Sequence, residues 1–153
     1  MRLLLEKDLL VFRKENLLDE DVLGCRDGKT FEERYLRKGF TEKISVVRIL
    51  DSHRENFRLS KAYQGKVDVI NVVTAPEIEM LIILSEGKYE QFKKSGAKPS
   101  IFCKENLQMG KVKEYAFVES YFSDTDKLVS AIREYDRITK KKKDEFVLAD
   151  LLK

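Results

Sequence analysis

Two short apolar runs rich in β-branched residues constrain the fold of this chain most strongly. Residues 44–50 (ISVVRIL) and 67–73 (VDVINVV) lack the period of an amphipathic helix, and this predicts two buried strands. The second run leads into a threonine, a proline and a glutamate, the usual order of a helix cap and first turn. A helix is therefore expected over residues 76–94, after two strands that are adjacent or nearly so in one sheet.

Other segments show weaker signals. Residues 1–18 mix both periods and leave helix and strand open, with residues 8–12 as the better strand candidate. Gly24 and Gly28 indicate a turn after a short strand, and Thr30 with Glu33 forms a capping box before a helix over residues 31–40. Three further helices are expected, over residues 98–107, 112–122 and 124–138, the last opened by Ser123 and Asp126.

This alternation of strands and helices predicts an α/β domain with a mainly parallel sheet flanked by helices. At 153 residues the chain fits one domain, with a sheet-containing part (1–95) and a mostly helical part (96–153). The helix after the second strand is expected to bury an apolar surface against the sheet. The residues of this surface are Ile78, Leu81, Ile82 and Leu84.

Composition narrows the class of protein. Hydrophobic residues make up 42% of the chain and charged residues 37%, which predicts a globular protein with a strongly solvated surface. No apolar run approaches the length of a membrane span, and charges at residues 6–8 interrupt any signal-peptide core, so we expect a cytoplasmic protein without a membrane partner. Cys25 and Cys103 lack metal or redox spacing and are expected to be reduced.

The formal net charge of +3 is too small to indicate nucleic-acid binding by itself. The positive charge is locally concentrated in Lys140, Lys141, Lys142 and Lys143. These lysines are either a non-specific phosphate contact or a solvated helix end whose cations suit the helix dipole.

The main candidate site follows the first strand. Asp51 and His53 are two residues apart, so they can project to one side of the chain at the carboxyl edge of the sheet, where α/β proteins bind ligands. Asp27, Glu77 and Glu79 follow turns expected at the same edge. A carboxylate suits Mg²⁺ or Mn²⁺, and a histidine suits Mn²⁺ better than Mg²⁺. The alternative is that Asp51 and His53 are polar loop residues and Glu77 is a helix cap.

These motifs resemble those of RloB-like proteins and the wider TOPRIM group. The residues that carry the resemblance are RDGKTFEERYL (26–36), the strand ending in Asp51, and NVVTAPEIEMLIIL (71–84), within about residues 22–95. The resemblance implies a TOPRIM-like fold, acidic residues that hold a divalent metal at a phosphodiester, and an association with prokaryotic defence or mobile elements. The chain departs from the family pattern at Asp27, which is glutamate there, at Glu32, displaced by Phe31, and at His53, which is the second aspartate there.

Two functions remain open on the sequence. The first is a metal-dependent phosphodiesterase or nuclease, with Asp27 and Asp51 as metal ligands, His53 as ligand or general base, and Glu79 as a ligand or supporting group. Nucleic acid would then be the partner.

The second is a non-catalytic binding or inhibitor protein on the same scaffold, with a protein partner in a host–phage conflict complex. Its surface would include a dense aromatic stretch that otherwise belongs to the core. This stretch consists of Tyr115, Phe117, Tyr121 and Phe122.

Overall fold

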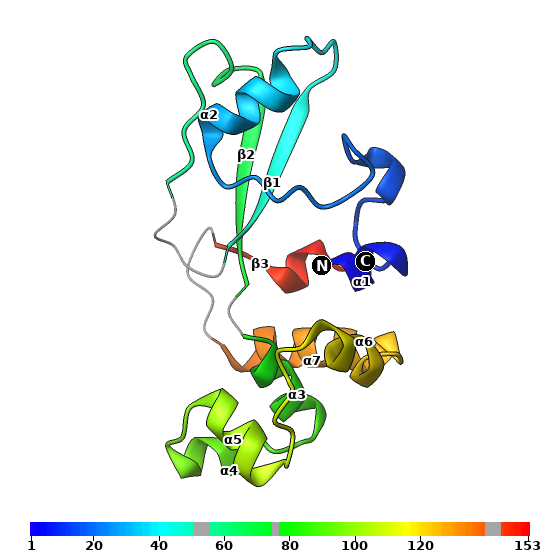
Figure 1. The fold of residues 1–153 in the computed structure, drawn as a ribbon, viewed down its shortest axis with the longest axis vertical. Helices are drawn as coiled ribbons and strands as arrows, with labels where there is room; N and C mark the ends of the chain where they lie inside the picture. Colours follow the sequence, from blue (N-terminus) through cyan, green and yellow to red (C-terminus); the bar gives the residue numbers. More distant parts are fainter. Residues whose placement is uncertain (51–55, 75–76, 140–144) are drawn as a thin grey trace.

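The computed structural model describes residues 1–50, 56–74, 77–139 and 145–153. Within them the chain has an α/β fold with a three-stranded parallel sheet in the order β1–β2–β3 (Figure 1). β1 (Ile44–Leu50) and β2 (Val67–Val73) pair over their full length, which confirms the two predicted strands and their adjacency. β3 (Phe146–Val147) pairs only with the last two residues of β2.

The prediction that the first strand is buried holds only in part. In β1 only Arg48 and Leu50 are buried, and Ser45 is exposed. The reason is the strand order: β1 lies at the edge of the sheet, so no strand covers its outer side within the described residues. The apolar run at residues 44–50 indicates contact with both layers beside the sheet, not a central position in it.

Helical elements cover both faces of β1 and β2. On one face Ile44 and Val46 join a small cluster with Phe31 and Leu36, from α2 (Gly28–Phe31) and the π-helical turn η2 (Glu32–Leu36). On the other face Val47, Ile49 and Val72 join the larger core. That core includes residues of α1 (Arg2–Glu6) and of the 3₁₀ helix η3 (Leu148–Leu151).

The remaining helices form a separate layer below the sheet in Figure 1. They are α3 (Ile78–Ser85), α4 (Tyr89–Ser95), α5 (Pro99–Asn106), α6 (Tyr115–Tyr121) and α7 (Thr125–Ile138). The prediction for α3 holds in part: Leu81 and Ile82 are buried in one core with Val72 of β2, whereas Ile78 and Leu84 are half-buried. Its main contacts are with α7 and α5 and not with the sheet. Its fully covered residues are Glu79, Leu81, Ile82 and Ile83. No helix among the described residues is both long and apolar enough to cross a membrane.

The helix predicted over residues 76–94 is two helices. Gly87 has a φ of +65°, and its amide donates to the carbonyl of Leu84 at 2.9 Å. The amide of Lys88 donates to the carbonyl of Ile83 at 3.0 Å. This pair of bonds is a Schellman motif, which ends α3 and turns the chain before α4 begins. Pro76, the predicted first-turn residue, lies outside the described residues.

Helix starts also differ from the predicted caps. The N-cap of α2 is Asp27, whose carboxylate accepts hydrogen bonds from the amide and hydroxyl of Thr30, both at 2.8 Å. α7 begins after Asp124, which accepts from the amide of Asp126 at 3.0 Å, and not after Ser123. In each case an aspartate close to the predicted cap supplies the acceptor, a role that this side chain fills at least as well as serine or threonine.

The two ends of the chain meet beside the sheet (Figure 1). Residues 2–6 are helical, and the predicted strand at 8–12 is reduced to one antiparallel bridge between Leu10 and Leu152. Residues 22–27 belong to no helix or strand, so the short strand predicted before Gly24 is absent from this described segment. The C-terminal part is not only helical, because it supplies β3.

Candidate functional site

A cavity of about 970 Å³ lies along the outer edge of β1 and can hold a ligand. Every residue of β1 lines it, together with residues 40–43 that lead into the strand. Successive side chains of a strand point to opposite faces of the sheet. A cavity lined by all of them must therefore run along the edge of the strand and reach around to both faces.

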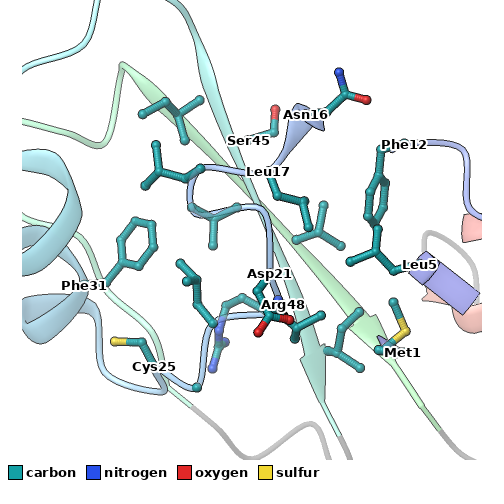
Figure 2. A pocket seen from close by; sticks show the side chains of 18 of the residues that line it. Met1, Leu5, Phe12, Asn16, Leu17, Asp21, Cys25, Phe31, Ser45 and Arg48 are labelled. Atoms are coloured by element: carbon teal, nitrogen blue, oxygen red, sulfur yellow. Dashed lines mark hydrogen bonds between the residues drawn. The ribbon is translucent and has the colours of Figure 1, made fainter. Parts of the chain in front are cut away.

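The walls of the cavity come from both layers (Figure 2). Phe31 and Cys25 lie to one side of β1, and Met1, Leu5 and Phe12 lie to the other. The opposite wall is the segment from Asn16 to Arg26, which begins at the end of a 3₁₀ turn and carries Leu17, Asp21 and Cys25 past the strand. The cavity is thus mostly apolar, with a backbone edge as its floor.

The register of the sheet defines which backbone groups of β1 face the cavity. The carbonyl of Leu50 accepts from the amide of Thr74 at 2.6 Å, so the backbone groups of Leu50 point toward β2. Because these groups alternate along a parallel strand, those of Ser45, Val47 and Ile49 point outward. Within the described part of the chain, no backbone hydrogen bond joins these three residues to residues 10–26.

Most charged side chains of the cavity have partners within the protein. Arg48 is buried, donates to Asn71 Oδ1 at 3.1 Å, and lies 4.7 Å over the ring of Phe57. Lys43 pairs with Asp68 at 2.7 Å. Asp21 pairs with Arg2 at 3.4 Å. These interactions leave the apolar walls and the strand edge as the main binding features.

The two residues at the centre of the predicted metal site lie outside the described residues. Asp51 and His53 follow Leu50 directly, and Lys140–Lys143 follow α7. The structure therefore tests neither the predicted metal pair nor the predicted lysine contact. The cavity does reach Leu50 and Thr74, so it extends to the carboxyl ends of β1 and β2, where the ligand site was expected.

Asp27, a predicted metal ligand, has a structural role at the start of α2. The hydrogen bonds from the amide and hydroxyl of Thr30 hold the pKa of its carboxyl below the usual range. One of its oxygens, Oδ2, accepts both bonds. The side chain is otherwise exposed.

Glu79, the predicted supporting group, is buried in the helical layer. Its side chain is 1% exposed, and Nζ of Lys113 lies 3.1 Å from its Oε1. This contact raises the pKa of Lys113. The neighbouring thiol of Cys103 is buried beside Glu79, and burial, followed by the charge of Glu79, raises the pKa of Cys103 to about 11. Glu79 thus forms an ion pair that ties α3 to the chain before α6.

The structure does not bring Asp27 and Glu79 together. Asp27 precedes α2, which lies beside the upper part of the sheet, and Glu79 belongs to α3, in the helical layer below the sheet (Figure 1). Among the residues that the structure describes, no group of three or more histidine, cysteine, aspartate or glutamate side chains is close enough to hold a metal ion. The shared acidic rim around Asp51 and His53 stays a prediction, and in this structure Glu79 contacts Lys113 and not Asp27.

Sequence reasoning missed the cavity itself. Its lining combines Met1, Phe12, Cys25 and the whole of β1, which are far apart in the chain. The only local signal was a strand of apolar character with an arginine near its end. Models of protein families, curated proteins and solved structures were compared with the chain, and none of them matches.

Proposed function

We propose that this chain is a binding module that holds part of a partner in the cavity along β1. The observation that carries the proposal is the coincidence of a cavity of about 970 Å³, mostly apolar walls and a strand edge that pairs with no strand of the described residues. Such a concave, mostly apolar space with few polar groups is typical of ligand sites. This is the second of the two functions that the sequence left open.

The roles of the described carboxylates support the binding function over the metal-dependent nuclease. Asp27 is engaged as a helix cap, and Glu79 is covered by Lys113. The TOPRIM-like identity, the Mg²⁺ or Mn²⁺ site at Asp51 and His53, the lysine contact to nucleic acid, and the link to defence or mobile elements all stay predictions. A nuclease would need metal ligands such as Asp51 and His53, which lie outside the described residues.

A peptide-display selection with matched variants tests the proposal. Random heptapeptides are selected on the immobilised protein and then measured in solution against Ser45→Trp and Ile101→Trp. Ser45 is exposed and lines the cavity, so tryptophan fills the space there. Ile101 is 43% exposed on α5 and does not line the cavity, so its variant carries the same bulk elsewhere.

We expect to select peptides whose affinity for Ser45→Trp is at least about tenfold weaker than for the unmodified protein. Their affinity for Ile101→Trp should equal that for the unmodified protein. Bound ligand should also slow the alkylation of Cys25, which lines the cavity, whereas Cys103 is fully buried with or without ligand. A selection without cavity-dependent ligands would overturn the proposal. Mn²⁺-dependent cleavage of nucleic acid that Asp51→Ala abolishes would favour the nuclease instead.

A further inference from the structure

We infer that the partner is an extended polypeptide segment that adds to the sheet as a fourth strand along the outer edge of β1. The inference rests on the proposed binding function and names the chemical class of its ligand. Segments of this kind bind through main-chain hydrogen bonds, and their alternate side chains enter pockets on either side of the new strand.

The backbone of β1 supplies the hydrogen-bonding groups. Ser45, Val47 and Ile49 direct their amides and carbonyls into the cavity, and among the described residues no backbone group bonds to them there. A ligand that supplies complementary donors and acceptors to these amides and carbonyls is favoured over one that does not, as for any unpaired strand edge. The backbone of another extended chain satisfies them in the spacing that β1 presents.

The walls define the side chains of the segment. An added strand would direct alternate residues toward Phe31 and Phe57 on one face of the sheet and toward Leu5 and Phe12 on the other. Both groups are apolar, so the segment carries consecutive apolar side chains and not the alternating pattern of a half-exposed strand. Since β1 has seven residues, a segment of about seven residues spans its edge.

The shape of the cavity excludes a second copy of this chain as the occupant. The wall formed by residues 16–26 stands in front of the edge of β1 in every copy, so two such edges cannot approach each other. A single extended peptide carries no such wall, so it can approach the edge of β1. The competing arrangement is internal: residues 22–26 line the cavity, belong to no helix or strand, and would compete for the edge by closing onto β1.

The test uses N-methylated versions of the cavity-dependent heptapeptides from the display selection. One series is methylated on the amides of residues 2, 4 and 6, and the matched series on residues 3 and 5. The amides of alternate residues point to opposite edges of a strand, and only one edge of an added strand bonds to β1. One methylated series should therefore lose at least about tenfold in affinity, and the other should lose little. The unmodified peptide should also slow hydrogen exchange of the amides of Ser45, Val47 and Ile49 at least about tenfold.

The outcomes separate this inference from the proposed function. Cavity-dependent peptides that are insensitive to methylation in both series would overturn the strand-addition inference and leave the binding function intact. Amides at Ser45, Val47 and Ile49 already protected without peptide would show that residues 22–26 close the edge, which would also overturn it. A selection without any cavity-dependent peptide overturns both.

Discussion

The carbonyl oxygen of Leu50 accepts hydrogen bonds from both the amide and the hydroxyl of Thr74, at 2.6 and 3.0 Å. This contact at the end of the sheet fixes the orientation of every backbone group in β1, because the groups alternate strictly along a paired strand. The backbone groups of Val46, Arg48 and Leu50 bond to β2. Those of Ser45, Val47 and Ile49 face the cavity. The candidate site thus follows from the register of β1 and β2.

Proline substitutions at neighbouring positions of β1 should have different costs. Val46→Pro removes an amide that bonds to β2, whereas Val47→Pro removes an amide that faces the cavity, and both side chains are half-buried. We expect Val46→Pro to lower the free energy of unfolding by about 1–3 kcal/mol more than Val47→Pro, as measured by urea denaturation. Equal losses would mean that both amides are bonded, and the outer edge of β1 would then not be open.

Gly28 should tolerate no side chain. A Cβ at this position would lie 2.3 Å from the carbonyl oxygen of Arg58, a backbone atom that cannot move aside alone. We expect Gly28→Ala to destabilise the protein by about 1–3 kcal/mol through overpacking. Gly24→Ala is the control, since a Cβ there meets nothing within 4 Å. A near-neutral Gly28→Ala would show that α2 does not approach Arg58 this closely.

The carboxylate of Glu86 should stabilise the helical layer in a pH-dependent way. Tyr121 Oη donates to it and Nζ of Lys127 lies 3.3 Å away, and these contacts lower the pKa of Glu86 below its usual 4.5. A carboxyl whose pKa is lower in the folded state contributes stability above its unfolded pKa, and this contribution is lost as the pH falls through the folded pKa.

Glu86→Gln should therefore cost about 1 kcal/mol near pH 7, a value reduced for its partial exposure, and progressively less below pH 4.5. Tyr121→Phe, which removes only the donor hydroxyl, is expected to show a loss of the same sign. Thermal denaturation over a pH series measures both. A cost of Glu86→Gln that stays constant through acid pH would contradict the assigned contacts.

Aspartate substitutions should separate a helix cap from a metal ligand. Asp27→Ala removes the acceptor for the amide and hydroxyl of Thr30, so we expect a lower melting temperature. On the binding function, calorimetry should give the same Mn²⁺ titration for the unmodified chain, Asp27→Ala and Asp51→Ala. Loss of Mn²⁺ binding in Asp51→Ala would restore the metal site predicted from the sequence.

The sequence predicted the sheet better than its surroundings. The β-branched runs indicated both strands, and the alternation of strands and helices indicated the parallel pairing that β1 and β2 show. The layer that covers α3 was not predictable in this way. An apolar helix such as Ile78–Ser85 is equally suited to a sheet or to other helices, and only the positions of α5 and α7 decide between them.

The candidate site was less accessible to sequence reasoning than the fold. A carboxylate near a helix start, such as Asp27, looks the same in sequence whether it caps the helix or binds a metal. Glu79 lies one residue into α3, yet it faces Lys113, which is distant in the chain. The cavity depends on where residues 16–26 cross β1, and no local pattern of apolar residues encodes that crossing.

Hydrogen exchange of the free protein, resolved for each amide of β1 by NMR, tests the open edge most directly. We predict an alternating pattern, in which the amides of Val46, Arg48 and Leu50 exchange at least about tenfold more slowly than those of Ser45, Val47 and Ile49. Uniform protection along the strand would contradict it, because the outer edge would then already be paired.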